Sequence, residues 1–237
     1  MKNLLFGLIA TVFITSNSFG QDDINMGELH NKVLTIYYQQ NKDGKFKDLV
    51  QLNSDLFKIN SELYPDLLKN ISESDIEKFT FELYGTLDPA KFNYQDRVAY
   101  LLDQCVSKGS ISKDLSSVYK KILISNPEKE EAFNLLDDFL KTKELKDSDK
   151  KSIDAFKSLY LASEILWSSL NENQNQTTAR CNASAQISFA DAFGGMIGGA
   201  IGSSVPGPGT WIGAFLGNQG MSALIRHLQA NNGGSCI

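Results

Sequence analysis

Apolar residues recur every three or four positions along most of the chain, between about residue 24 and residue 170. This spacing places the apolar side chains on one face of an α-helix, and the strict alternation typical of strands is absent from the pattern. The region predicts an all-α fold of six to eight helices, arranged as an antiparallel bundle or as stacked helical pairs. Apolar positions that mark successive predicted helices are Val33, Leu49, Phe79, Leu101, Leu115, Leu136 and Phe156.

Local signals indicate where several of these helices begin and end. Ser74 and Asp75 are typical of a helix start, and Gly109 is typical of the residue just after a helix. Asn126 followed by Pro127 predicts another helix start, because proline fits the first helical position. A spacing of about 30 to 35 residues per helix pair also admits a helical-repeat architecture, although no repeated consensus supports it.

The C-terminal stretch from Phe189 to Leu228 follows a different pattern. It contains 10 of the 18 glycines of the chain, and no charged residue lies between Asp191 and Arg226. Large and small residues form separate rows at a spacing of four, which places each row on one helix face. The large row is Phe189, Phe193, Ile197 and Ile201, and the small rows are Ala190, Gly194, Gly198 and Gly202 and, beside them, Gly195, Gly199 and Ser203.

A turn divides this stretch into two arms. Val205 to Gly209 reads VPGPG, which stops a helix because proline lacks a backbone donor and glycine permits positive φ. Thr210 can cap a second helix that begins at Trp211, and Gly213, Gly217 and Gly220 form a second small row along it. The stretch therefore predicts a glycine-zipper helical hairpin, in which rows of small residues let two backbones approach closely.

The lengths of the arms are compatible with a membrane. They span roughly 25 Å and 27–30 Å at the helical rise, against a bilayer core of about 30 Å. Folding at the turn places Asp191 and Arg226 at the same open end, where an interface would accept both charges, while Trp211 and Phe215 anchor one arm. The arms can also lie in the interface or line a pore as oligomers. The alternatives are a hairpin buried in a soluble protein and a disordered or aggregating tail.

The cysteines suggest a clasp around the hairpin. A disulfide between Cys181 and Cys236 would close a loop of about 55 residues, which stabilises a fold by roughly 4 kcal/mol in the chain-entropy model. Such a bond suits an extracytoplasmic protein. The alternative is two unpaired thiols. Cys105 lies in a predicted amphipathic helix beside Leu101 and Leu102, and we expect it to be a buried free thiol.

The run GGMIGGAIGSSVPGPGTWIGAFLG resembles the glycine-rich, membrane-active part of class II bacteriocins, especially the two-peptide and cysteine-closed types. The resemblance covers about residues 181–237 and does not extend to the N-terminal helical region. It implies a secreted segment that permeabilises membranes.

The N-terminus has the three parts of a secretory signal. Lys2 supplies the positive charge, Leu4 to Thr15 form an apolar core, and Ser18 to Gly20 offer small residues for cleavage. The predicted organisation is a signal peptide at 1–20, a helical domain at 21–170, a polar linker or frayed helix end at 171–180 and the hairpin at 181–237. The protein is expected to be exported to the periplasm or the extracellular space, either free or associated with a membrane.

The net charge and the short sequence motifs argue against several classes of function. The formal net charge is −5, which argues against nucleic acid as a partner because phosphate binding needs a basic surface. The two histidines, His30 and His227, have no neighbouring ligand at metal-binding spacing, and both are expected at a surface or interface. The Ser-x-x-Lys matches lack the companion motifs of a serine hydrolase, and the glycine runs lack the ending of a phosphate loop.

The sequence therefore predicts a non-enzymatic protein without a cofactor, whose hairpin associates with or permeabilises membranes and can self-associate. The alternative is a soluble helical scaffold or binding module whose hairpin packs on its own bundle or on a protein partner.

Overall fold

The computed structural model of this chain describes residues 26–41, 45–68, 71–142, 144–172, 183–202 and 209–232. These residues form helices and no strand, which confirms the predicted all-α fold. The helices are α1 (Met26–Gln40), α2 (Leu49–Leu63), α3 (Pro65–Leu68), α4 (Glu73–Tyr84), the 3-10 turn η1 (Pro89–Lys91), α5 (Tyr94–Ser107), α6 (Lys113–Ser125), α7 (Lys129–Thr142), α8 (Asp147–Glu172), α9 (Ala183–Gly202) and α10 (Gly209–Asn231).

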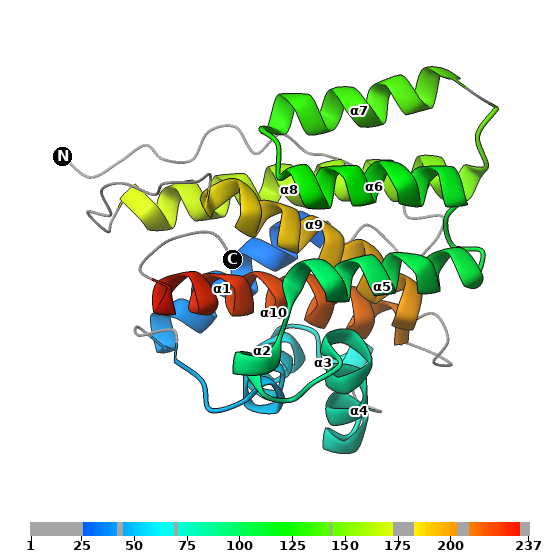
Figure 1. Cartoon of the computed structure of the whole chain (residues 1–237). Coiled ribbons are helices and arrows are strands. Elements are labelled where there is room, and N and C mark those ends of the chain that lie inside the picture. Colours follow the sequence, from blue (N-terminus) through cyan, green and yellow to red (C-terminus); the bar gives the residue numbers. More distant parts are fainter. Residues whose placement is uncertain are drawn as a thin grey trace.

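The last two helices occupy the middle of the molecule. Figure 1 shows α9 and α10 side by side, with α6, α7 and α8 on one side of them and α2, α3 and α4 on the other. Helix α8 packs along α9, α1 packs on α8 and α2, and α10 contacts α1, α2 and α4. The predicted hairpin is thus an integral layer of the bundle.

Caps explain where several helices begin and end. Ser72 and Asp75 form a capping box at the start of α4, so this helix begins slightly before the predicted Ser74. It ends at Gly85, which adopts a φ of 71° that glycine tolerates without strain. Asn126 takes a left-handed conformation with a φ of 41° and caps the end of α6, and α7 begins only at Lys129, so the helix start predicted at Asn126 and Pro127 is wrong. Gly109 has a φ of 74° soon after α5, in agreement with the predicted helix end.

The hairpin also supplies the centre of the hydrophobic core. The ring of Phe193 on α9 lies 4.9 Å from the ring of Phe156 and 5.8 Å from that of Tyr119, measured between centroids. Nearby, Phe189 lies 4.8 Å from the ring of Tyr160. Aromatic rings from α6, α8 and α9 therefore meet in one cluster, which joins the C-terminal hairpin to helices from the middle of the chain.

We expect Phe193→Ala to lower the free energy of unfolding by about 3–5 kcal/mol, because it empties a fully buried aromatic site. The matched control is Phe81→Ala on α4, where the side chain is 56% exposed, and it should change stability by about 0.5 kcal/mol or less. Urea unfolding followed by circular dichroism measures both. Equal effects of the two substitutions would contradict a core centred on α9.

Candidate functional site

The helical hairpin is enclosed by the rest of the chain. On α9, every side chain from Ala185 to Gly199 is buried except the half-buried Met196. On α10, every residue from Leu216 to Ile225 is buried. A helix that presents no polar face to water normally lies in a protein core or in a membrane. Here the core is that of the chain itself, which is the packing that the alternative interpretation of the sequence described.

Glycines bring the two arms into backbone contact. A Cβ atom added to Gly198 would lie closer than 3.0 Å to the carbonyl oxygen of Gly213, and one added to Gly194 would meet that of Gly217 in the same way. The reverse also holds, because a Cβ atom on Gly217 would meet the carbonyl oxygen of Gly194. The row formed by Gly194 and Gly198 is therefore the contact between the arms.

Other glycines fit the hairpin to the surrounding helices. A Cβ atom on Gly195 would collide with a methyl group of Leu159 on α8, and one on Gly220 would collide with the hydroxyl of Tyr84 on α4. On α9, Gly195 thus faces Leu159 of α8, while Gly194 and Gly198 face α10. The glycines therefore serve two kinds of contact, one between the two arms and one between the hairpin and the surrounding helices. The sequence predicted only a close approach of two helices.

The structure shows the surroundings of only some of the remaining predicted site residues. Ile197, Gly199 and Gly213 are buried inside the bundle. Gly202 ends α9, and Trp211 and Phe215 belong to α10, but the surroundings of these three are outside the described part of the structure. The turn at 203–208, Cys181 and Cys236 and most of the predicted linker at 171–180 also lie outside it.

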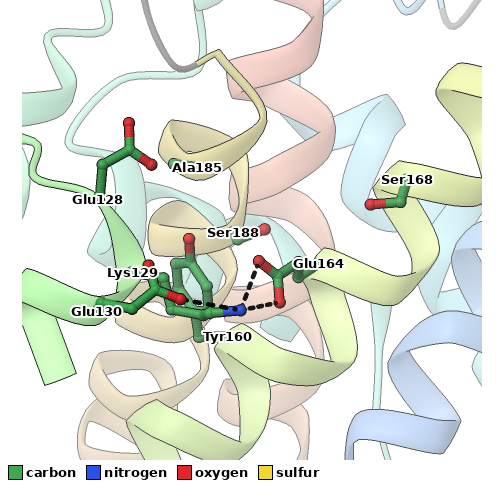
Figure 2. A pocket seen from close by; sticks show the side chains of 8 residues that line it. All are labelled: Glu128, Lys129, Glu130, Tyr160, Glu164, Ser168, Ala185 and Ser188. Atoms are coloured by element: carbon green, nitrogen blue, oxygen red, sulfur yellow. Dashed lines mark hydrogen bonds and ion pairs between the residues drawn. The ribbon is translucent and has the colours of Figure 1, made fainter.

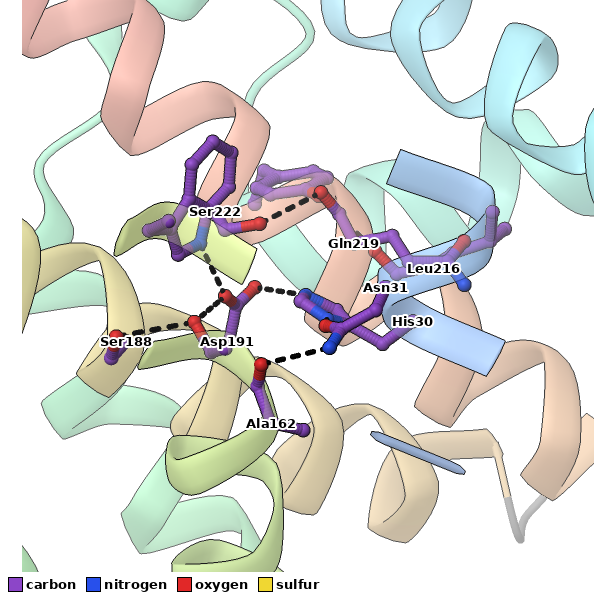
Figure 3. A network of polar contacts seen from close by, with 11 residues as sticks. His30, Asn31, Ala162, Ser188, Asp191, Leu216, Gln219 and Ser222 are labelled. Atoms are coloured by element: carbon purple, nitrogen blue, oxygen red, sulfur yellow. Dashed lines mark hydrogen bonds and ion pairs between the residues drawn. The ribbon is translucent and has the colours of Figure 1, made fainter. Parts of the chain in front are cut away.

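A buried carboxylate anchors the hairpin to the bundle. Asp191 of α9 is 0% exposed, and its Oδ1 lies 3.0 Å from Nε2 of His30 on α1. Its other oxygen, Oδ2, accepts hydrogen bonds from the hydroxyl of Ser163 and, at 3.0 Å, from Nε1 of Trp167, both on α8. Figure 3 shows the ring of His30 directed toward the carboxylate of Asp191. We call Asp191, His30, Ser163 and Trp167 the polar anchor.

Two expectations from the sequence are wrong at this point. Asp191 was expected at an interface and His30 on the surface of the first helix, yet His30 is only 1% exposed. His30 shares one face of α1 with Val33, Leu34 and Tyr37, at spacings of three, four and seven. These spacings could have identified His30 as an inward-facing residue, but the sequence could not supply its partner, which is 161 positions away.

Both nitrogens of His30 have acceptors. Nδ1 lies 2.8 Å from Oδ1 of Asn31, whose own amide donates to the carbonyl oxygen of Ala162 at 2.9 Å. Burial by itself lowers the pKa of His30, but the charge of Asp191 and the hydrogen bonds to Asp191 and Asn31 together raise that pKa above 6.5. The protonated ring therefore suits this site, since it donates through both nitrogens.

The other charged side chain of the hairpin, Arg226, contacts the same two helices, α1 and α8. The guanidinium of Arg226 lies 4.8 Å from the ring centroid of Trp167 and 4.7 Å from that of Tyr38. Trp167 thus touches both the buried Asp191 and the half-buried Arg226. Cation–π contacts of this kind stabilise by about 0.5–2 kcal/mol.

The polar anchor does not have the geometry of a nucleophilic site. Ser163 donates to the carboxylate of Asp191, which is also held by Trp167 and paired with His30, so this carboxylate is engaged in the anchor. Asp191 and His30 are also closed off from solvent. Within the part of the chain that the structure describes, no group of three His, Cys, Asp or Glu side chains is placed to hold a metal ion. The arrangement is that of a structural tie.

The hairpin carries a polar stripe that the bundle pairs only in part. Asn218, Ser222, Arg226 and Gln229 follow one another at spacings of four, four and three, so they share one face of α10. Gln229 donates to Gln186 of α9 at 2.8 Å. Both side-chain polar atoms of Asn218, in contrast, are buried without a hydrogen-bond partner. Such groups typically destabilise a fold by about 1–3 kcal/mol each.

The thiol of Cys105 is buried and free, which confirms the prediction for this residue. Burial raises its pKa to about 11, and a protonated buried thiol is a poor nucleophile. Cys105 consequently acts as an apolar side chain in the core of α5.

Gly198→Ala should lower the free energy of unfolding by about 2–3 kcal/mol, because the new methyl group collides with backbone that cannot move aside. Gly195→Ala on the same helix is the matched comparison. Its methyl group meets chiefly the end of a leucine side chain, and the gain in helix propensity of roughly 1 kcal/mol offsets part of the strain. Denaturant unfolding of both variants measures the difference. A larger loss for Gly195→Ala would contradict the contact between the arms.

The polar anchor predicts a pH dependence of stability. The folded-state pKa of His30 is raised, so its contribution is fully present below the unfolded value of about 6.5 and is lost as the pH rises through the folded value. The free energy of unfolding should fall over this range in the native chain and in His227→Gln, but not in His30→Gln. Urea titrations at a series of pH values measure this, and an unchanged slope in His30→Gln would refute the assignment.

Comparison of the whole chain with protein-family models, with curated proteins and with solved structures finds no match. Among the described helices, none combines the length and the apolar character needed to cross a membrane. The indications of function are therefore the enclosed hairpin and its polar anchor.

Proposed function

We propose that this protein is an exported, non-enzymatic helical protein that stores a glycine-rich hairpin inside its own bundle. In this proposal the hairpin, α9 with α10, associates with a membrane when the bundle opens, and it then disturbs the bilayer. The stored form is the one described above. The membrane-associated form is the functional one.

One observation carries the proposal: in the described parts of the uncharged stretch, 192–200, 213–214 and 216–225, every residue is buried except the half-buried Met196 and Ala200. Such a hairpin is unsuited to solvent, so it has few environments other than this core. A membrane interface or a second protein can take over the apolar contacts that the bundle now provides. The surrounding helices are amphipathic and would keep their polar faces in water during such an exchange.

The polar stripe supports an interfacial position for the hairpin. Asn218 is unpaired inside the bundle, and it shares a face of α10 with Arg226 and Gln229. At a membrane surface this face could turn to water and headgroups while the apolar and glycine faces turn inward. The stripe therefore favours a hairpin that lies in the interface, consistent with the bacteriocin-like composition of residues 181–237.

The release of the hairpin depends on the contacts that tie it to α8. Ser163 on α8 and Ser188 on α9 have hydroxyl oxygens 3.2 Å apart in the interior. A disulfide between cysteines at these two positions would join α8 to α9 covalently. Formation of the bond can be verified by mass spectrometry of proteolytic peptides.

The test is co-sedimentation of the double variant Ser163→Cys, Ser188→Cys with phospholipid vesicles, together with dye release from the same vesicles. We expect the oxidised variant to lose at least 90% of the membrane binding of the native chain, and the reduced variant to regain it, because the bond blocks separation of α9 from α8. The single variant Ser163→Cys controls for the lost hydrogen bond to Asp191. Equal binding by the oxidised and reduced forms, with the bond verified, would contradict release of the hairpin.

A second function, a helical scaffold or binding module, is favoured by the fit of the glycines to the bundle. Gly195 admits Leu159, and Gly220 admits Tyr84, so α9 and α10 are shaped to helices of the same chain. In a scaffold the hairpin never leaves the core. Native protein that fails to bind vesicles in either redox state, while remaining folded and monodisperse, would support this function.

A further inference from the structure

A buried ion pair joins the first helix to the hairpin. Nε2 of His30 on α1 lies 3.0 Å from Oδ1 of Asp191 on α9, and both side chains are buried. Neither of these two atoms has a hydrogen-bond partner elsewhere in the described structure. Because a buried charge without a partner is strongly destabilising, each of the two groups depends on the other.

The other titratable groups that face this pair keep one charge state near neutral pH. Arg226 of α10 lies over the ring of Tyr38, and a guanidinium stays charged in this range. Burial and the charge of Asp55 on α2 raise the pKa of Tyr37 to about 12. Burial also raises the pKa of Tyr38 and that of Tyr94 on α5. These three hydroxyls are therefore neutral wherever the histidine changes its charge.

On the side of α7, the charged side chains pair with each other. Figure 2 shows Lys129 beside Glu164, and its Nζ donates to both carboxylate oxygens at 2.9 and 3.1 Å. The hydrogen bond to Glu164 raises the pKa of Lys129, so this ammonium stays charged near neutral pH. Both groups line a pocket with Ser188 of α9, whose hydroxyl lies 3.2 Å from that of Ser163 in the polar anchor. Among the described groups around the anchor, His30 is therefore the one that gains or loses a proton near neutral pH.

The protonation of His30 depends on whether the hairpin is enclosed. Burial by itself lowers the pKa of His30, but Asp191 and Asn31 together raise that pKa above 6.5 in the enclosed state. In a released state the ring is in water, where the pKa of histidine is about 6.5. Between these two pKa values the enclosed state binds one more proton than the released state. A rise in pH through this window therefore favours release.

We propose that the pair of His30 and Asp191 is a pH switch, in which loss of the proton from His30 separates α9 from α1 and opens the bundle around the hairpin. The hairpin is enclosed at acid pH and released as the pH rises above neutrality. The opening itself follows from the buried pair, whereas its consequence for membranes rests on the function proposed above.

Hydrogen exchange of the full chain without membranes tests the switch, with rates corrected for the intrinsic pH dependence of exchange. In the native chain the protection of α9 should fall as the pH rises above about 6.5, by at most about tenfold per pH unit because one proton is involved. The protection of α6 should change less than that of α9, since the opening is local. His227→Gln, which alters the other histidine, is the matched control and should respond as the native chain does.

Asp191→Asn should reverse the direction of the response. Without the carboxylate charge, burial dominates and lowers the pKa of His30 in the enclosed state. The enclosed state then excludes the protonated ring, so α9 should lose protection as the pH falls. In His30→Gln the protection of α9 should be low and independent of pH. If circular dichroism shows that either variant is unfolded, NMR titration of His30 in the native chain replaces it, and the midpoint must coincide with the loss of protection in α9.

Protection of α9 that is independent of pH, that changes equally in His30→Gln, or that falls together with an equal loss in α6 would overturn the switch. Co-sedimentation with phosphatidylcholine vesicles over the same pH range then tests the consequence for membranes, and binding should rise as the protection of α9 falls. A pH-dependent opening of α9 without vesicle binding at any pH would keep the switch and count against the proposed membrane function alone.

Discussion

The structure depends on the contact between two polypeptide backbones, where glycines of α9 meet glycines of α10. At Gly194 and Gly198 a side chain as small as a methyl group would collide with a carbonyl oxygen of the opposite arm. Close backbone approach compensates for the low helix propensity of glycine only if the contact is dry. The hairpin therefore needs an enclosure, and the remaining helices provide one by turning their apolar faces toward it.

Because the hairpin is enclosed, a charged side chain on it needs partners inside the protein. A carboxylate in the interior is tolerated only when opposite charge and hydrogen bonds replace the water that it loses. Asp191 obtains these from His30 on α1 and from Ser163 and Trp167 on α8. The anchor thereby fixes how α9 sits against α1 and α8. Removal of His30 would leave the charge of Asp191 uncompensated in the core. The two charged side chains therefore depend on each other.

Not every polar side chain of the hairpin has a hydrogen-bond partner inside the bundle. Asn218 contributes polar atoms that find no partner, while Gln186 and Gln229 pair with each other across the arms. A core evolved only for stability would be expected to replace such a residue with an apolar one. Unpaired polar groups beside a dry glycine contact fit a segment that has a second environment, and this agrees with the membrane-associated state that we propose.

The sequence by itself determined the helices, because helical periodicity and helix-ending glycines such as Gly109 are local properties that need no distant partner. It also determined that Gly194 and Gly198 form a close helix contact, since their spacing of four places both on one face. Only the tertiary structure decided what surrounds the hairpin, because an uncharged helix is equally compatible with a protein core and a membrane. The pairing of His30 with Asp191 was likewise decided by tertiary packing, since nothing local to either residue specifies a partner from the other end of the chain.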